Sequence, residues 1–237
     1  MKTEALEYKH AGSSLEAFIA WEKFKEKRPG ILIFHAWQGR DEFVLEKAKW
    51  LAQLGYVGIA VDLYGKGILG GSAEENAKLM EPFIKDRKYL LDRMQIALKA
   101  AQSHSAVDAQ KMAAIGFCFG GLCALDLARS GAFLEGVVSL HGRLTPPENV
   151  RNKRIQAKIL VLHGHDDPMV PPEQVLAFEK EMTERGVDWQ VHAYGRTQHA
   201  FTNPVANDPS MGTVYNPLAE KRALQSTESF LSELFNP

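Results

Sequence analysis

Cysteine is scarce in this chain, which has two in 237 residues, Cys118 and Cys123. Two thiols cannot build the multi-bridge framework of a small secreted protein, and they are too few for a four-thiolate zinc site. Free thiols suit a reducing compartment, and the N-terminus lacks the apolar core of a secretory signal. We therefore expect a cytoplasmic protein.

An excess of one charge is also lacking. Lys and Arg total 28, Asp and Glu total 29, and the formal net charge is −1. So small a net charge creates no long-range field that would attract nucleic acid or an anionic membrane surface. Uninterrupted apolar runs are far shorter than the ~20 residues of a membrane-spanning helix. We expect no nucleic-acid partner and no membrane partner, while a hydrophobic content of 45% argues against disorder.

Short apolar runs alternate with longer amphipathic stretches along the chain. This order, without any shift in composition, indicates an α/β fold with a mostly parallel central sheet, helices on both faces and a single domain over residues 1–237. Strands are expected at residues 31–35, 56–61, 112–117, 136–140, 158–163 and 189–194. Helices are expected at residues 43–54, from about 73 to 101 with a break near Pro82, and at 122–128, 172–185 and 218–235.

The most specific local pattern joins an expected strand to an expected helix: Gly116-Phe117-Cys118-Phe119-Gly120-Gly121. It is the G-x-C-x-G-G form of the elbow that presents a nucleophile above the sheet of an α/β-hydrolase. Side chains two residues before and after the nucleophile would collide across so sharp a turn, which explains the glycines. The backbone N–H of Phe119 would then donate to an oxyanion.

The two cysteines admit different interpretations. A buried cysteine usually serves as a small apolar side chain, and Cys123, inside an apolar helical face, fits that role. For Cys118, the elbow alone does not decide between a packing role and a catalytic role. A dinucleotide-binding loop is excluded because the G-x-G-x-x-G spacing is absent.

Two further chemical groups follow expected strands downstream of Cys118. Asp167 lies just after the strand at 158–163, and His199 lies in the loop after the strand at 189–194. Nucleophile, acid and histidine occur in this chain order in α/β-hydrolases, and parallel strands gather their carboxyl ends at one edge. Asp166 is a competing acid, whose alternative role is to cap its own loop.

Taken together, the cysteine elbow, the D-x-x-V-P segment at 167–171 and His199-Ala200-Phe201 resemble the dienelactone hydrolase family over residues 10–235. The resemblance implies that Cys118 is the nucleophile, Asp167 the acid and His199 the base. It implies carboxymethylenebutenolidase-type hydrolysis of a small ester or lactone through a thioester. We expect no cofactor and no metal, and the sequence leaves the oligomeric state, monomer or dimer, open. The N–H of Trp37 would be the second oxyanion donor.

The sequence departs from the family pattern at two positions. Ala36 occupies the place of a glutamate that helps to activate the nucleophile in the family's type enzyme, so activation falls to His199, or to His35 or Gln38 nearby. Asn203 occupies the place of an arginine that holds the substrate carboxylate. An anionic lactone is therefore a less secure substrate than the family name implies.

Other polar and aromatic residues near strand ends are candidates for substrate contact. His35, His141, Arg143 and Phe201 form this set. A buried core histidine is the simpler interpretation of His35, and Arg143 fits a solvated surface arginine as well as a carboxylate-binding group. Loops at 65–80, 141–156 and 200–216 are expected to line the pocket.

Two other functions compete with hydrolysis by a thiol. The cluster His163-x-His165-Asp166-Asp167 offers donors of the kind found in zinc hydrolases, but the rest of that pattern is absent. The missing glutamate also allows a family member that has lost catalysis and binds a ligand or a protein partner.

Overall fold

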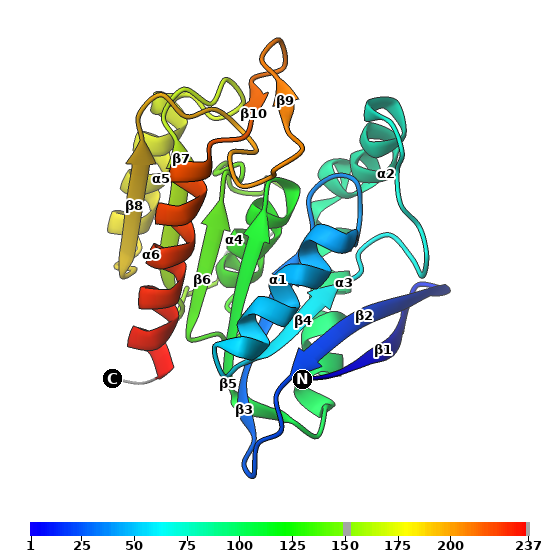
Figure 1. Ribbon diagram of the computed structural model, residues 1–237. Helices are drawn as coiled ribbons and strands as arrows, with labels where there is room; N and C mark the ends of the chain where they lie inside the picture. The colour runs from blue at the N-terminus through cyan, green and yellow to red at the C-terminus, as the bar shows by residue number, and fades with distance from the viewer. Residues whose placement is uncertain (149–152, 236–237) are drawn as a thin grey trace.

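The protein is described by a computed structural model that covers residues 1–148 and 153–235. Eight strands form one sheet in the order β1-β2-β4-β3-β5-β6-β7-β8. The six strands from β4 to β8 in this order run parallel, whereas β1 and β2 are antiparallel and extend the β4 edge (Figure 1). The strands are β1 Lys2–His10, β2 Ser13–Trp21, β3 Arg28–Phe34, β4 Val57–Val61, β5 Val107–Phe117, β6 Gly136–Leu140, β7 Lys158–Gly164 and β8 Trp189–Tyr194.

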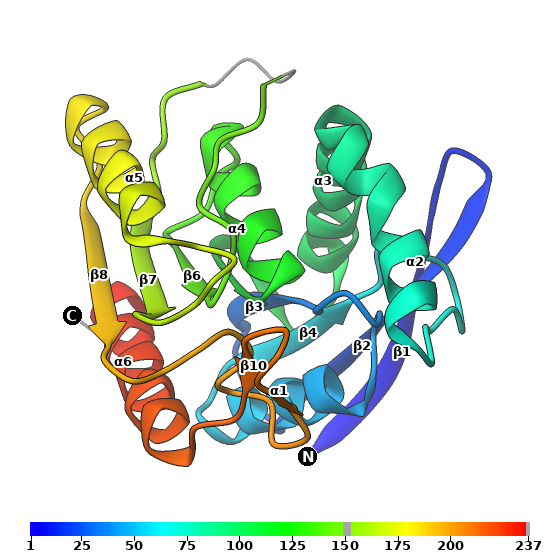
Figure 2. The ribbon, with the colours of Figure 1, turned by 90° about the horizontal axis from the view of Figure 1, so that it is seen from above.

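Helices cover both faces of this sheet, as predicted. In Figure 2, α1 and α6 lie on one side of the strands and α3, α4 and α5 on the other. Each face has its own cluster of buried apolar side chains, because strands buried on both faces carry apolar residues at successive positions. The helices are α1 Glu42–Gln53, α2 Ala73–Lys85, α3 Arg87–Ser103, α4 Phe119–Arg129, α5 Pro172–Glu184 and α6 Pro217–Phe235.

Side-chain caps define where helices begin. The carboxylate of Asp41 accepts a hydrogen bond from the N–H of Val44 at the start of α1. The expected break near Pro82 lies four residues later, where Asp86 separates α2 from α3 and accepts from the N–H of Tyr89. The proline is tolerated inside α2, and the cap decides where the second helix starts.

Four strands differ from expectation because the sequence pattern did not predict them: β1 and β2, which form the N-terminal hairpin, and the two-residue strands β9 (Asn207–Asp208) and β10 (Thr213–Val214). Most of β1 is exposed, with Tyr8 as its buried residue, so it lacks the apolar run that marked the central strands. An edge hairpin packs one face only, and its alternation is a weaker signal than a buried run.

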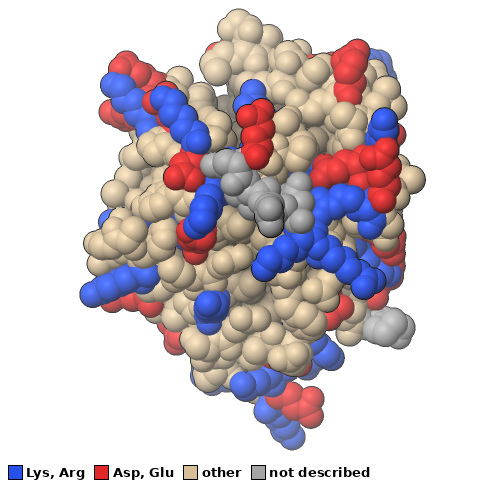
Figure 3. Space-filling model, turned by 180° about the vertical axis from the view of Figure 1, so that it is seen from behind, with Lys and Arg blue, Asp and Glu red and all other residues tan. Residues whose placement is uncertain are grey.

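The surface agrees with the balanced composition. Figure 3 shows Lys and Arg side chains interspersed with Asp and Glu on the face seen from behind. Many of these charges pair locally, as Lys78 does with Glu74. Within the described residues, no helix combines the length and the apolar character that crossing a membrane requires.

Candidate active site

Cys118 lies between β5 and α4 with a strained backbone, at φ +55° and ψ −114°. A Cβ on Gly116 would lie 1.9 Å from the carbonyl oxygen of Gly120, and a Cβ on Gly120 would lie 2.0 Å from that of Phe34. Both approaches are far inside contact distance, so only glycine fits at either position. The expected elbow and the reason for its glycines are confirmed.

The two thiols differ in exposure. Cys118 is half-buried at the elbow, whereas Cys123 is buried on the first turns of α4. Burial raises the pKa of Cys123 well above its ordinary value, and the charge of Asp126 acts in the same direction. A neutral, enclosed thiol is a packing residue, in line with the expectation for Cys123.

The structure brings Asp167 and His199 together. Oδ2 of Asp167 lies 2.7 Å from Nδ1 of His199, and Oδ1 accepts a hydrogen bond from the N–H of Met169 at 2.8 Å. Asp167 is only 2% exposed. Asp166 is exposed. Of the two adjacent acids, Asp167 is therefore the one that meets the histidine.

The loop that carries His199 is anchored through its backbone. The N–H of His199 donates to the carbonyl of Gly212 at 2.9 Å, and its carbonyl accepts from the N–H of Val214 at 3.0 Å. Nε2 of His199 is buried and has no hydrogen-bond partner among the described residues. This nitrogen is therefore the one available to exchange a proton.

Electrostatic coupling links Cys118 to His199. Burial alone would raise the pKa of the Cys118 thiol. The positive charge of His199, the polar interaction of the sulfur with the imidazole ring and the N–H of Phe119 act against burial, and together they hold that pKa below its ordinary value. Burial likewise opposes protonation of His199, yet the Cys118 thiolate and the hydrogen bond to Asp167 raise the pKa of His199 to about 10. Both shifts favour a thiolate–imidazolium pair over the neutral thiol and imidazole.

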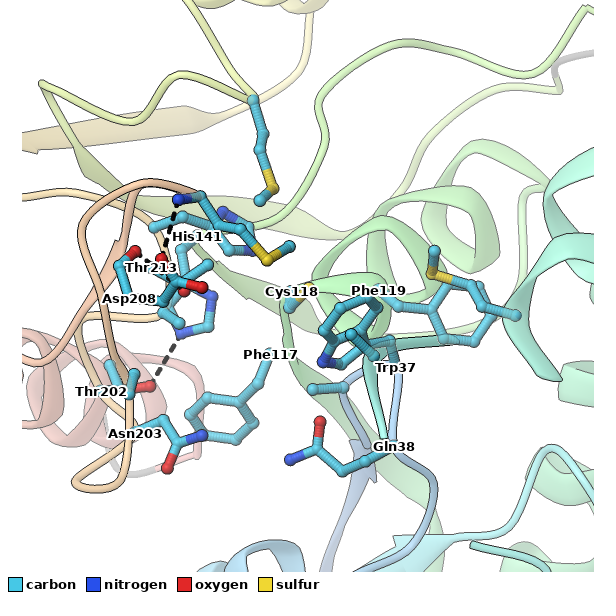
Figure 4. Close-up of a pocket in the computed structure, with 18 of the residues that line it drawn as sticks. Trp37, Gln38, Phe117, Cys118, Phe119, His141, Thr202, Asn203, Asp208 and Thr213 are labelled. Carbon is cyan, nitrogen blue, oxygen red and sulfur yellow. Dashed lines mark hydrogen bonds between the residues drawn. The ribbon is translucent and has the colours of Figure 1, made fainter. Parts of the chain in front are cut away.

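Trp37 and Phe119, whose N–H groups are the expected oxyanion donors, both line the cavity together with Cys118. In Figure 4, Trp37 and Phe119 lie on one side of Cys118, and His141 and Thr202 lie on the other. Phe119 is the first residue of α4, whose N-terminal N–H groups favour negative charge. No described residue accepts a hydrogen bond from the N–H of Trp37.

Ala36, at the position of the family's glutamate, and the nearby Gln38 occupy positions that could affect the activation of the thiol. Ala36 and Gln38 both line the cavity in front of Cys118. Gln38 donates from Nε2 to the carboxylate of Asp41 at 2.9 Å, which ties its side chain to the start of α1. His199 is the titratable side chain that lowers the pKa of the thiol, whereas the charge of Asp167 raises it.

A cavity of about 730 Å³ opens over the elbow. All three loops expected to line it contribute, although residues 149–152 of the second loop lie outside the described part of the chain. Among the described lining residues, Arg143 and Asp208 are the only side chains of the Lys, Arg, Asp and Glu types. Its apolar wall includes Phe43, Met80, Ile84, Phe117, Phe119, Leu122, Met169, Val205 and Met211.

The four candidates for substrate contact separate into two pairs. His141 and the exposed Arg143 line the cavity. His35 and Phe201 are each 0% exposed and do not line it, so the expected contact with substrate is corrected for both. Phe201 lies against the ring of His141 at 5.2 Å between centroids, as part of the core beneath the site.

Thr202 lines the cavity and was not among the site residues predicted from the sequence. Thr202 lies 2.8 Å from Nε2 of His141, and the ring of His141 lies 5.1 Å from that of His199. Burial lowers the pKa of His141 well below its ordinary value, and the charge of His199 adds to this, so His141 is neutral. The position of Thr202, three residues after His199, was the available signal.

The alternative of a zinc site depends on the cluster of His163, His165, Asp166 and Asp167. Among the described residues, no group of three or more His, Cys, Asp or Glu side chains is arranged to hold a metal ion. His165 and Asp166 are exposed, and Asp167 turns toward His199 instead.

Comparisons with known proteins identify the family of the chain. The family model described as "Dienelactone hydrolase family" matches residues 15–235. A solved dienelactone hydrolase-like promiscuous phosphotriesterase from metagenomic libraries is 34% identical, covers 99% of each chain and superposes with a TM-score of 0.94. A second solved structure, named m3DLH, is 36% identical with the same coverage and TM-score. A Bradyrhizobium protein named probable 2-oxo-3-(5-oxofuran-2-ylidene)propanoate lactonase is 26% identical over 93% of this chain and 90% of its own. The chain therefore belongs to the dienelactone hydrolase family of hydrolytic enzymes.

Proposed function

We propose that the protein hydrolyses small esters or lactones by a Cys118–His199–Asp167 triad that forms a thioester intermediate. The observation that carries this proposal is the convergence of the three side chains, with Asp167 on one ring nitrogen of His199 and a free Nε2 on the other. The depressed pKa of Cys118 supplies a thiolate, which is the reactive form.

In the acylation step, the Cys118 thiolate attacks the carbonyl carbon and a C–S bond forms. The carbonyl π electrons move to oxygen, which accepts hydrogen bonds from the N–H groups of Trp37 and Phe119. As the tetrahedral intermediate collapses, the C–O bond breaks and the leaving alkoxide takes the proton from Nε2 of His199. For a lactone, this alkoxide stays attached to the acyl group.

Deacylation returns the site to its starting state. Neutral His199 takes a proton from a water molecule, which attacks the thioester carbonyl. The second tetrahedral intermediate then expels the Cys118 thiolate and releases the acid, and His199 keeps its proton. Asp167 holds the Nδ1–H tautomer throughout and stabilises the imidazolium. Esters and lactones suit a thiolate better than amides, because amines are poorer leaving groups.

Within this reaction class, the cavity supports uncharged substrates. Its wall is mostly apolar, and half-buried Asn203 stands where the family resemblance expects a carboxylate-binding arginine. Arg143 is exposed at the surface, and Asp208 carries the opposite charge in the same lining. Among the described lining residues, no buried Lys or Arg would receive a substrate carboxylate, which would enter at a cost in solvation.

Mass spectrometry tests the mechanism directly. After a brief reaction with an aryl ester, we expect one acyl adduct on the peptide that contains Cys118, and Cys118→Ala should lose both adduct and hydrolysis. Cys123→Ala is the matched control, because that thiol is enclosed and its pKa is raised. Hydrolysis by Cys118→Ala at the wild-type rate would refute the proposal.

Phosphotriester hydrolysis is a second candidate, favoured by the solved relative that is described as a promiscuous phosphotriesterase. The same thiolate would attack phosphorus and expel an aryloxide, and water would then displace the sulfur. Release of more than one equivalent of aryloxide from a dialkyl aryl phosphate, abolished in Cys118→Ala, would support this activity.

A further inference from the structure

We propose that His35 and Tyr64, two core residues that do not line the cavity, are positioning residues for the oxyanion hole. They hold the backbone on both sides of Trp37 and so aim its N–H at the developing negative charge. This inference rests on the proposed function, in which Trp37 supplies one of the two donors.

His35 is fixed by hydrogen bonds at both ring nitrogens. The N–H of Leu63 donates to Nε2 at 3.2 Å, so that nitrogen carries no proton. Burial lowers the pKa of His35 and keeps the ring neutral, which leaves the proton on Nδ1. Nδ1 lies 2.7 Å from the carbonyl oxygen of Ala36 and therefore donates to it.

The bond to Ala36 determines the direction of the next N–H. The carbonyl of Ala36 and the N–H of Trp37 belong to one planar trans peptide, and they point in opposite directions. His35 holds the oxygen toward the core, and the N–H of Gly39 donates to the same oxygen at 3.2 Å. The N–H of Trp37 is thereby directed away from the core, on a residue that lines the cavity.

Tyr64 restrains the following peptide. Its hydroxyl donates to the carbonyl oxygen of Trp37 at 2.9 Å. The rings of Tyr64 and His35 meet edge to face with centroids 4.7 Å apart, so each helps to fix the other. The loop carries no helix or strand hydrogen bonds at Trp37, and these two side chains supply the restraint that secondary structure would otherwise give.

The consequence is a donor that does not have to reorganise as the reaction proceeds. An oxyanion hole is effective because its donors already point to where charge develops. A released Trp37 peptide could turn its N–H toward solvent, and stabilisation of the tetrahedral intermediate would fall. Attack on a carbonyl requires this donor, whereas alkylation of the thiolate by iodoacetamide creates no oxyanion.

Acylation by an ester and alkylation by iodoacetamide both use the Cys118 thiolate, but only acylation uses the oxyanion hole. Comparing the two rates therefore separates a defect in the oxyanion hole from damage to the nucleophile. In Tyr64→Phe and His35→Gln we expect the acylation rate with an aryl ester to fall by about 10- to 100-fold. KM should change little, and the rate and pH profile of iodoacetamide labelling at Cys118 should match those of the wild type. Tyr8→Phe is the matched control: it removes another buried phenol, bonded to the carbonyl of Asp62 at 2.5 Å, and should keep full ester activity.

His35→Asn provides a rescue, because the asparagine amide can place a donor near Nδ1 and keep the bond to Ala36. Activity closer to wild type in His35→Asn than in His35→Gln supports the proposal. Unchanged acylation in Tyr64→Phe, or a parallel loss of iodoacetamide labelling, would overturn it. Full activity of Cys118→Ala would instead refute the proposed function, so the two failures are distinguishable.

Discussion

The Asp167 carboxylate lies 2.7 Å from Nδ1 of His199, and the N–H of Met169 holds its second oxygen at 2.8 Å. This bond places a proton on Nδ1 and leaves Nε2 to face the chemistry. The acid therefore fixes both the tautomer and the orientation of the base. The neighbouring acid, Asp166, is exposed and has no part in this contact.

Replacing Asp167 with asparagine should impair catalysis while preserving the fold. The amide can present an N–H to Nδ1 and so favour the tautomer with its proton on Nε2, the wrong nitrogen for a base. We expect kcat for an aryl ester to fall by ~10²–10⁴-fold. Asp166→Asn is the adjacent control and should stay within twofold of wild type by steady-state kinetics. Equal losses in both variants would exclude Asp167 as the specific acid.

The pH dependence of iodoacetamide labelling should report the depressed pKa of Cys118. The thiolate is the reactive form, so labelling is fast above this pKa and falls as the pH is lowered through it. Because this pKa lies below that of an ordinary thiol, labelling should persist to lower pH than labelling of an unperturbed thiol does. Cys123 should stay unlabelled in the folded protein, because its pKa is raised and it is buried.

His199→Gln should move this labelling profile to higher pH, because it removes the cation and leaves the desolvation that raises the thiol pKa. A wild-type midpoint at the value of an unperturbed thiol would favour the family member that binds a ligand without catalysis. An identical midpoint in wild type and His199→Gln would contradict the coupling of these two groups.

Gly116→Ala should prevent the elbow from forming. The added Cβ would lie 1.9 Å from a backbone oxygen of Gly120, and neither strand nor helix can yield. We expect a loss of at least ~3 kcal/mol in the free energy of unfolding, at or above the usual range for overpacking. Urea denaturation measures it, with Gly195→Ala as control, since a Cβ there meets nothing within 4 Å. A small, equal effect in both variants would contradict the elbow geometry.

The fold, and the strand ends that carry the proposed triad, could be predicted because both depend on strong local signals. Buried parallel strands appear as apolar runs, and their carboxyl ends must share one edge of the sheet. Cys118, Asp167 and His199 each follow such a run, so their proximity could be inferred without coordinates. Glycine spacing at the elbow was equally informative, because steric exclusion at 116 and 120 leaves no alternative residue.

What the sequence could not provide depends on contacts between distant segments. His35 and His141 both follow apolar runs, yet one is enclosed in the core and the other lines the cavity. That difference arises from Leu63 and Tyr64, which arrive from the end of β4 and cover His35. Local pattern cannot reveal which neighbour will cover a side chain, and Phe201 was misjudged for the same reason.

The side chain at position 203 should determine whether the cavity prefers an uncharged or an anionic substrate. Asn203 is half-buried and lines the cavity, in the place where the family resemblance expects an arginine. The wild type should therefore prefer an uncharged lactone to its carboxylate-bearing analogue. Asn203→Arg should shift the ratio of kcat/KM toward the anionic lactone by about 1 kcal/mol, or roughly fivefold.

Two comparisons make this last experiment specific to charge. Asn203→Gln lengthens the side chain without a charge and should leave the ratio unchanged. The shift in Asn203→Arg should shrink as salt is added, because a partly exposed ion pair is screened. An arginine that leaves the ratio unaltered at low salt would show that residue 203 does not reach the substrate, and that selectivity for charge arises elsewhere in the lining. Arg143 would then be the residue to replace, because it is the one arginine, and there is no lysine, among the described lining residues.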